Sequence, residues 1–349
     1  MGFNKGEWSE LYTFLYLLEN PNLVIVDENL EVINNTFFKI LEIILADKKY
    51  KIEDQNIAKL FNNGKTINYE LSHIFEQNKI LLEKILAHKK AKGSFEINEI
   101  QPLIDDFFNG KKPKGSSNIK ADLIANVLDT RRIQDFNISY NIKSSLGSPA
   151  TLLNASKHTN FIYEVTSIDD EIMNQSNNIN TSKTLLDRCN FLKSKRAIFS
   201  FTKTESCMFE RNLKLIDSKL DEILAQILIL SYEKNIKDMK ELISLISNNE
   251  NENIFYKKKM GDFANAVTFG MRAGETWNGS NEVNGGIILV TKFGEVYLLD
   301  LIYFKNIVDK YLIDNIKLDS PSFTRYKMFD IYKNNGKYYF KLNLQIRFK

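Results

Sequence analysis

The sequence predicts a protein of the α/β (α+β) class, with a mixed β-sheet flanked by helices. Three observations lead to this prediction. Apolar residues recur at helical spacing over residues 5–19 and over residues 213–228. Residues 120–128 and 135–143 are short runs rich in apolar and β-branched residues, which is typical of neighbouring strands. Turn sequences near the end of the chain predict hairpins, so we expect helical insertions and a hairpin-rich C-terminal region beside the sheet.

The first third of the chain is expected to be mostly helical. Residues 5–19 predict an amphipathic helix that ends before Pro21. Residues 23–33 form two short apolar runs about an Asp-Glu-Asn turn, which predicts a hairpin. A helical region is expected from about residue 36 to residue 109, and the polar segment 111–117 is expected to be a loop.

The middle of the chain is expected to alternate between strands and helices. After the two predicted strands, residues 148–156 have the pattern of a capped short helix, and residues 161–165 have that of another strand. Residues 213–228 predict a long helix with one buried face, and residues 239–246 predict a second helix. An Asn- and Glu-rich break follows at residues 248–253.

The break at residues 248–253 predicts a division into two regions. The first, residues 1–247, holds the sheet core with its helical insertions. The second, residues 254–349, is β-rich and is expected to pack closely on the core. Its two hairpins are expected to be residues 287–290 with 296–301 and residues 328–332 with 337–348.

Composition argues against several classes of protein. The chain has 349 residues, enough to bury a large core, and its 47 basic and 44 acidic residues give a net charge of only +3. Any nucleic-acid surface must therefore come from local clusters of basic side chains. No apolar run reaches the roughly 18 residues of a membrane span, and the start lacks the core of a signal peptide, so we expect a cytoplasmic protein. Two cysteines and three scattered histidines disfavour a zinc site or a disulfide scaffold.

An acid and a lysine on the two predicted neighbouring strands form the candidate catalytic centre. These residues are Asp122 and Lys143. Carboxylate oxygens hold Mg²⁺, which polarises a phosphate, and a lysine beside the attacking water favours hydroxide and offsets the developing charge. This is the chemistry of the PD-(D/E)xK nuclease core, although an acid and a lysine at such a separation also occur by chance as an ordinary surface pair.

A second acid is needed to complete a Mg²⁺ site. The PD-(D/E)xK pattern places it two positions before the lysine, where this chain has Asn141, and an amide is a poor Mg²⁺ ligand. The sequence alone offers four candidates for the missing acid, namely Glu10, Glu96, Glu99 and Glu164.

Three long patterns, in order from one end of the chain to the other, resemble a known family. They are Phe3 to Leu11, Asn141 to Phe161 and Leu342 to Phe348. Together they resemble the HpaII family of restriction endonucleases. The resemblance implies a PD-(D/E)xK core with Asp122 as metal ligand and Lys143 as catalytic lysine.

Two further residues of the catalytic centre depend on this resemblance. Nucleases of this core often place a glutamate on the helix that precedes the sheet, which makes Glu10 the first choice for the second metal ligand. The family segment usually reads Ser-Ile-Lys-Ser, and Asn141 departs from it at the first position. We keep Asn141 among the candidate catalytic residues.

The resemblance also implies an activity, a cofactor and partners. It implies a type II restriction endonuclease that uses Mg²⁺ to cut both strands of DNA at a short palindromic site, CCGG, and leaves 5′ phosphates. A palindrome is most simply bound by a two-fold symmetric protein, so we expect a homodimer. A cognate DNA methyltransferase that acts on the same site is implied as well, and no membrane contact is expected.

Polar and basic residues outside the catalytic centre are candidates for contacts with DNA. Small polar residues that follow the lysine strand can donate to phosphate oxygens or base edges, although helix capping and solvated surface are the alternatives. A Gly-rich loop with arginine, aromatic and amide groups suits base recognition, because arginine can bridge guanine O6 and N7, and a structural loop is the alternative. The candidates are Ser144, Ser145, Gly147, Ser148, Thr151, Asn154, Asn160, Arg131, Arg132, Arg272, Trp277, Asn278, Arg325 and Lys327.

Two other functions are compatible with the sequence. The first is a DNA-binding module with an inactive nuclease core, which Asn141 motivates, and DNA binding without discrete cutting would favour it. The second is a structural or protein-interaction factor built on the helical region 213–246. Absence of salt-sensitive DNA binding would favour the second.

Overall fold

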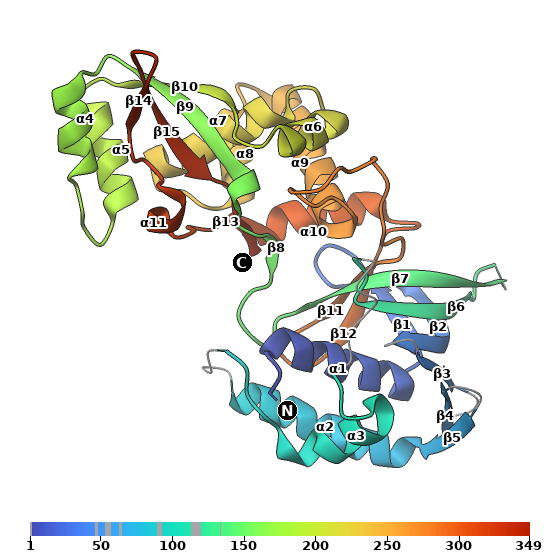
Figure 1. Cartoon of the computed structure of the whole chain (residues 1–349). Helices are drawn as coiled ribbons and strands as arrows, with labels where there is room; N and C mark the ends of the chain where they lie inside the picture. Colours follow the sequence, from blue (N-terminus) through green and yellow to red (C-terminus); the bar gives the residue numbers. More distant parts are fainter. Residues whose placement is uncertain are drawn as a thin grey trace. The chain divides into compact units, whose positions relative to one another are not determined.

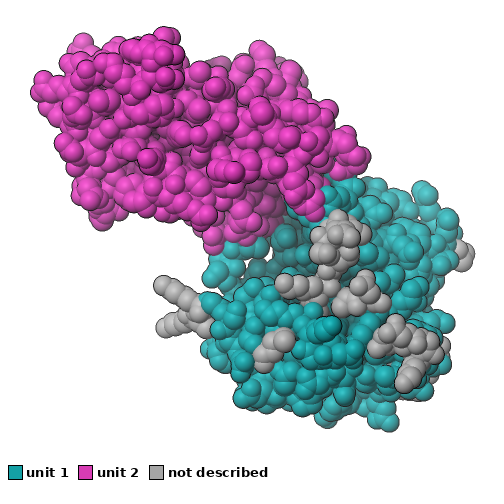
Figure 2. All heavy atoms as spheres, in the orientation of Figure 1, with its two compact units in different colours: residues 1–150, 281–311 teal, residues 151–280, 312–349 magenta. Residues whose placement is uncertain are grey.

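In the part of the chain that the structure describes, the strands form three separate sheets with helices around them (Figure 1). The computed structural model describes residues 2–45, 48–52, 57–62, 65–88, 93–112, 120–132 and 134–349. Within these ranges the chain divides into two compact units, which Figure 2 colours separately. The first unit holds residues 1–150 and 281–311, and the second holds residues 151–280 and 312–349. The mixed α+β class expected from the sequence is confirmed.

The first unit is built on a sheet with the strand order β1-β12-β11-β7-β6-β2-β3-β4-β5. The sheet is mixed, because β11 pairs in parallel with β7 and β12 pairs in parallel with β1, while the other pairs are antiparallel. Its strands are β1 (Asn22–Val26), β2 (Val32–Leu45), β3 (Lys48–Ile52), β4 (Ile57–Asn62), β5 (Lys65–Glu70), β6 (Leu123–Asp129), β7 (Gln134–Ser144), β11 (Gly286–Val290) and β12 (Val296–Asp300).

Helices of the first unit cover one face of this sheet (Figure 1). They are α1 (Lys5–Glu19), α2 (Leu71–Ala87), the short 3-10 helix η1 (Asn98–Ile100) and α3 (Gln101–Phe108). α1 begins with a capping box, in which the Asn4 side chain accepts from the Glu7 N–H and the Glu7 side chain accepts from the Asn4 N–H. Trp8 and Phe14 of α1 are fully buried against the sheet, which confirms the first predicted helix.

The predicted helical region 36–109 is wrong over its first half, where the chain forms β2 to β5. The buried side chains of β2 include Phe38, Ile40, Ile43 and Leu45. A register shift between Ile40 and Glu42 changes the alternation along the strand by one residue. The resulting spacing imitates a helical pattern, which explains the error. Helix begins only at Leu71.

The division into units differs from the boundary expected at residues 248–253. β11 and β12 form the predicted hairpin, yet they lie in the sheet of the first unit, because β11 pairs along its whole length with β7. Residues 281–311 therefore belong with the N-terminal part of the chain. The break itself falls inside the second unit, where Asn249 caps the helix α9 (Glu250–Phe269). A role of the C-terminal region in DNA recognition stays a prediction.

The second unit contains two smaller sheets. The strands β9 (Asn160–Thr166), β10 (Ile198–Thr204), β14 (Tyr332–Asn334) and β15 (Lys337–Asn343) form one, in the order β10-β9-β15-β14. The strands β8 (Thr151–Leu153), β13 (Ile316–Leu318) and β16 (Ile346–Phe348) form the other, in the order β13-β16-β8. Its helices are η2 (Lys157–Thr159), α4 (Asp170–Asn177), α5 (Thr184–Ser194), α6 (Cys207–Ile216), α7 (Leu220–Lys234), α8 (Met239–Ile246), α9 and α11 (Phe323–Tyr326), and α10 (Lys305–Asn315) runs from the first unit into it.

Three expectations for the second unit need correction. Residues 148–156 hold the strand β8 instead of a short helix, because Thr151 and Leu153 pair with β16. The long helix 213–228 is two helices, α6 and α7, separated where the Asp217 side chain accepts from the Lys219 N–H at 2.9 Å. The last hairpin is formed by β14 and β15 about the predicted Asn-Gly turn, so it starts later than residue 328. The strand at residues 161–165 and the helix at residues 239–246 are confirmed.

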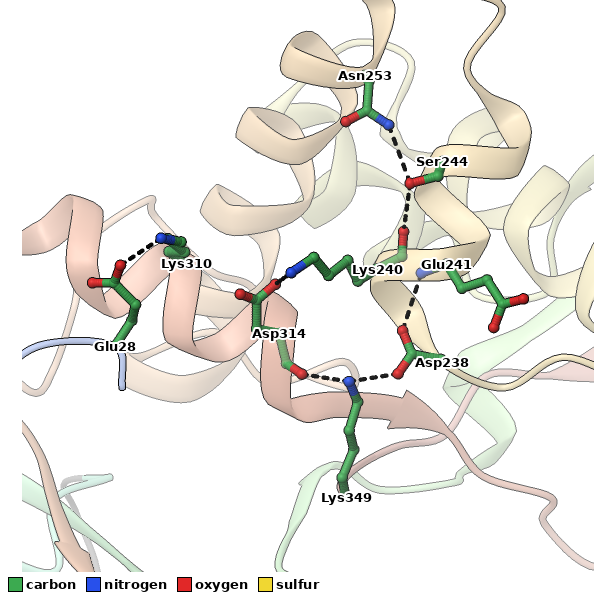
Figure 3. A network of polar contacts seen from close by, with 9 residues as sticks. All are labelled: Glu28, Asp238, Lys240, Glu241, Ser244, Asn253, Lys310, Asp314 and Lys349. Carbon is green, nitrogen blue, oxygen red and sulfur yellow. Dashed lines mark hydrogen bonds and ion pairs between the residues drawn. The ribbon is translucent and has the colours of Figure 1, made fainter. Parts of the chain in front are cut away.

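Ion pairs connect α8, α10 and the last residue of the sequence within the second unit (Figure 3). Lys349 pairs with Asp238, which also caps α8 by accepting from the Glu241 N–H at 3.0 Å. Lys240 on α8 pairs with Asp314 at 2.9 Å. No helix in the described ranges has the length and apolar character needed to cross a bilayer.

Replacement of Gly286 is predicted to destabilise the first unit strongly. Its φ is +119°, and an added Cβ would lie 2.1 Å from the backbone oxygen of Leu299 on the neighbouring strand. Backbone strain and overpacking together should cost Gly286→Ala about 2–5 kcal/mol. Gly93→Ala is a matched control, because Gly93 has φ +87° and nothing lies within 4 Å of an added Cβ. It should lose only about 1–2 kcal/mol in urea unfolding, and equal losses for both variants would contradict the steric account.

The buried carboxyl of Asp300 predicts a pH dependence of stability. Asp300 is fully buried at the end of β12, and burial raises the pKa of its carboxyl to about 6, although hydrogen bonds from Ile302 N–H and Tyr303 N–H oppose the shift. The folded state therefore binds the proton more tightly than the unfolded state, so this group adds stability at low pH that is lost as pH rises through about 6. Relative to Asp300→Asn, the parent should gain about 2–3 kcal/mol between pH 7.5 and pH 4. A constant difference between the two unfolding curves would contradict this assignment.

Candidate active site

A cavity of about 290 Å³ in the first unit brings together residues that are far apart in the sequence. It lies where the first turns of α1 meet the start of β6, the end of β7 and the segment after β7. The residues that line it are Lys5, Gly6, Ser9, Glu10, Asp122, Ile142, Lys143, Ser144, Gly147, Ser148 and Ala150. Asp122, Lys143 and Glu10, the predicted catalytic residues, share this one cavity.

Asp122 is held firmly by the backbone of β7. Its N–H donates to the Tyr140 carbonyl at 2.9 Å, and its carboxylate Oδ2 accepts from the Ile142 N–H at 2.7 Å. The carboxylate thus satisfies a strand N–H at the point where β6 has not yet begun. Within the described part of the chain, its other oxygen, Oδ1, has no hydrogen-bond partner. One oxygen is therefore structural and the other can act as a ligand.

Lys143 comes from a central strand of the sheet. β7 is paired on one edge with β6 and on the other with β11, where Lys143 lies opposite Leu289. The Lys143 side chain is half-buried and lines the cavity. Among the residues that the structure describes, its ammonium group has no ion-pair or hydrogen-bond partner. A lysine in this position can bind an anionic ligand without first breaking an ion pair.

Asn141 does not share this position. It is 2% exposed and is not among the residues that line the cavity, although it lies on the same strand as Lys143. The amide that replaces the usual acid of the nuclease pattern is therefore an interior side chain of the sheet. A catalytic role for Asn141 stays a prediction.

Glu10 is the acid that the cavity contains besides Asp122. It lies one helical turn after Gly6 on α1, and both residues line the cavity. Of the other acids proposed from the sequence, Glu99 forms an ion pair with Lys84, Glu164 belongs to the second unit, and Glu96 is not part of the cavity lining. Of the four glutamates proposed from the sequence, only the first choice, Glu10, lines this cavity with Asp122 and Lys143.

The segment after β7 contributes small polar groups to the same cavity. Ser144, Gly147 and Ser148 line it, and Ser145 is exposed beside them. The Ser144 Oγ accepts from the Leu146 N–H at 3.1 Å, and the Ser145 N–H donates to a carbonyl of β11 at 2.8 Å. These bonds give the segment a defined course past the cavity.

Comparison with known proteins places this arrangement in a family. The sequence model of the HpaII restriction endonuclease matches residues 4–348. The chain is 36% identical to the type II restriction enzyme HpaII of Haemophilus parainfluenzae, over 99% of this chain and 98% of that protein. The chain belongs to the HpaII restriction endonuclease family. No solved structure matches it significantly. As a member of this family the protein is an enzyme, a site-specific deoxyribonuclease.

Two polar side chains that line this HpaII-family site were not among the candidates from the sequence. Lys5 and Ser9 are one turn apart on α1 and line the cavity beside Glu10. Helical spacing from Glu10 is the signal that could have found them. The signal is weak, because a lysine in the first turn of a helix is common on protein surfaces.

Arg131 and Arg132 lie at the other end of the β6–β7 hairpin. β6 has 7 residues, so its two end residues are about 20 Å apart at roughly 3.3 Å per residue. The Arg131 guanidinium pairs with the buried Asp129 at 3.0 Å and stacks over the ring of Tyr303. The cavity of this HpaII-family enzyme therefore does not include these two arginines, and Arg131 has a structural role at the hairpin turn.

The remaining candidates for DNA contact lie in the second unit of the HpaII-family chain. Asn160 is buried, and its amide donates to Glu205 and accepts from Asn343, both at 2.6 Å, so it does not fit the predicted DNA contact. Asn154 is exposed. Thr151 is half-buried in β8 and pairs with β16.

Hydrogen bonds to α6 and within the loop itself order the predicted recognition loop around Trp277. The side chain of Asn212 on α6 accepts from the Trp277 N–H and donates to the carbonyl of Glu275 at 2.7 Å. The Trp277 carbonyl accepts from Arg211, and its indole N–H donates within the loop at 2.8 Å. Arg272 is half-buried, and the predicted contacts Asn278, Arg325 and Lys327 are exposed. A loop ordered in this way presents its exposed groups in fixed positions.

The donor set of the cavity fits a magnesium ion. Mg²⁺ takes oxygen ligands and is commonly held by one or two carboxylates, with water and substrate phosphate completing its coordination. Glu10 and Asp122 supply two carboxylates. Among the described residues, no group of three or more His, Cys, Asp or Glu side chains is placed to hold a metal ion.

Removal of either cavity carboxylate is predicted to weaken Mg²⁺ binding. Glu10→Gln and Asp122→Asn each remove one anionic ligand and should lower the affinity for Mg²⁺ at least about tenfold in calorimetric titration. Glu7→Gln is the matched control, because Glu7 lies on the same helix, pairs with Lys112 at 2.9 Å and is not part of the cavity lining. An affinity in either cavity variant equal to that of Glu7→Gln would contradict the site.

Proposed function

We propose that this enzyme is a Mg²⁺-dependent type II restriction endonuclease that hydrolyses both strands of DNA at the palindrome CCGG and leaves 5′ phosphates. The observation that carries the proposal is the shared cavity of Glu10, Asp122 and Lys143. Two carboxylates and an unpaired ammonium group at one site are the minimum that metal-assisted phosphodiester hydrolysis requires. Family membership supplies the DNA substrate.

The arrangement supports assignment to the PD-(D/E)xK nucleases. An acid precedes one strand of a hairpin and a lysine lies on the other strand of a mixed sheet, as that pattern requires. The acid that is missing at residue 141 has a replacement in Glu10, which reaches the cavity from α1. This replacement argues against the alternative of an inactive DNA-binding module, whose motive was the missing acid.

In the proposed mechanism each cavity residue has a distinct task. A bound Mg²⁺ would polarise the scissile phosphate and lower the pKa of a coordinated water, and Glu10 and Asp122 are the residues that would hold it. Lys143 hydrogen-bonds the attacking water and offsets the negative charge that develops on the phosphate. The water gives up a proton to solvent as its oxygen forms a bond to phosphorus, the bond from phosphorus to the 3′ oxygen breaks, and that oxygen takes up a proton. The upstream fragment then ends in a 3′ hydroxyl, and the downstream fragment keeps the phosphate on its 5′ oxygen.

Base recognition is proposed for the loop around Trp277 in the second unit. Arginine donates two hydrogen bonds to O6 and N7 of guanine, and the CCGG site offers two guanines on each strand. The carbonyl oxygen of Trp277 accepts a hydrogen bond from Arg211, and the neighbouring residue Asn278 is exposed. The serines after β7 are proposed to contact backbone phosphates beside the cut.

A homodimer is proposed as the form that acts on DNA. The two strands of a palindrome are related by two-fold symmetry, so two copies of this chain can cut both strands with one kind of active site. A cognate methyltransferase that modifies the same sequence would protect the host DNA, and both enzymes would act in the cytoplasm.

Digestion of a mapped plasmid tests the proposal. With Mg²⁺ the parent protein should give discrete fragments that end at CCGG, and EDTA should abolish cutting. Lys143→Met should cut about 10²–10⁴-fold more slowly, because it removes the group that assists the attacking water. Fragment ends that accept ligation without phosphorylation would show the 5′ phosphate.

Other outcomes would contradict parts of the proposal. Binding of CCGG DNA without cutting would favour the inactive module. Smeared products would indicate a non-specific nuclease, and discrete cutting at another sequence would overturn the assigned site. Equal rates for the parent and Lys143→Met would remove this cavity from the mechanism.

A further inference from the structure

We propose that Lys5 is a second catalytic lysine, which contacts the scissile phosphate together with Lys143. The inference rests on the proposed function and adds a residue to it. Lys5 is the first residue of α1, whereas Lys143 lies near the end of β7, and both line the same cavity. Lys5 is not among the catalytic residues that the family resemblance implies.

The charges of the cavity give the first argument. Its lining contains two acids, Glu10 and Asp122, and two lysines, Lys5 and Lys143, so the formal charges cancel. When one Mg²⁺ binds to the acids, the site carries two net positive charges. The transition state of hydrolysis carries two negative charges, one from the phosphodiester and one from the attacking hydroxide. Two lysines and one Mg²⁺ therefore match it, and electrostatic matching of this kind is a major source of catalysis.

The packing of Lys5 against Gly147 gives the second argument. A Cβ added to Gly147 would lie 2.8 Å from Cδ and 3.0 Å from Cβ of Lys5. The aliphatic stem of Lys5 thus passes directly over a residue that has no side chain. A stem confined in this way limits where the ammonium group can go, so less conformational entropy is lost when it binds a phosphate. Gly147 is a positioning residue in this arrangement.

The surroundings on α1 give the third argument. The Glu7 side chain belongs to the capping box that starts α1 and forms an ion pair with Lys112. Ser9 is buried, and its hydroxyl donates to the Lys5 carbonyl at 2.8 Å, which fixes the backbone at the start of the helix. The helix thereby delivers Lys5 and Glu10 to the cavity as one rigid unit.

Single-turnover cleavage of a CCGG duplex by the full-length protein with Mg²⁺ tests the inference. Lys5→Met should lower the cleavage rate constant about 10²–10³-fold, because it removes one charge that stabilises the transition state. Lys5→Arg keeps the charge and should recover the rate to within about tenfold of the parent. Lys49→Met is the control for the loss of one lysine, because Lys49 lies on β3 and pairs with Glu42. It should cleave within about twofold of the parent.

Gly147→Ala tests the positioning role with Lys5 still present. The added methyl group displaces the Lys5 stem and should lower the rate constant by less than Lys5→Met does. The double variant should be no slower than Lys5→Met alone, because the side chain that the methyl group displaces then carries no ammonium group to misplace. Thermal unfolding of each variant, together with its affinity for the duplex in Ca²⁺, separates a loss of catalysis from a loss of fold or of binding.

The outcomes distinguish this inference from the proposed function. A Lys5→Met variant that cuts as fast as Lys49→Met, while Lys143→Met is inactive, would overturn the role of Lys5 and leave the proposed function intact. Additive losses in the Gly147→Ala double variant would overturn the positioning role. A parent protein that fails to cut with Mg²⁺ would overturn the proposed function itself.

Discussion

The hydrogen bond from the Ile142 N–H to the Asp122 carboxylate is the interaction on which the site depends. It joins the start of β6 to the end of β7, at the point where the backbone pairing between these two strands ends. The same carboxylate therefore completes the sheet and faces the cavity. Because Lys143 follows Ile142 directly, the position of the acid relative to the lysine is set by main-chain geometry and not by flexible side chains. A site built on strands in this way keeps its shape before any ligand arrives.

Local sequence patterns predicted the helix and strands that carry the site. Features of the fold that depend on pairing between distant segments could not be predicted from such patterns. The periodicity of α1 and the two strands β6 and β7 are complete within short windows of sequence, and all three were predicted. β2 was not, because the bulge after Ile40 interrupts its alternation. The parallel pairing of β11 with β7 joins segments more than a hundred residues apart, and no local signal records it. The domain boundary expected at residues 248–253 therefore differs from the observed division into units.

Three residues that chemistry and resemblance selected from the sequence lie together in the structure, and their catalytic roles stay predictions. Asp122 and Lys143 followed from the requirements of phosphodiester hydrolysis, and Glu10 followed from the usual place of a helix glutamate; all three line the cavity. Asn160 and Arg131 could not be judged from sequence, because partners such as Asn343 and Tyr303 lie far from them along the chain. Burial and pairing are properties of the folded chain, so polar residues predicted for DNA contact separate into surface and structural groups only in three dimensions.

The interleaving of the two units along the chain has a consequence for biosynthesis. The strand β11 lies between β7 and β12 in the sheet that carries the site, yet it is encoded after the whole segment 151–280. A nascent polypeptide thus exposes the edge of β7 until most of the message has been translated. The sheet beneath the candidate site is therefore completed only late in synthesis. A fragment that ends before β11 would leave one edge of β7 without its partner strand.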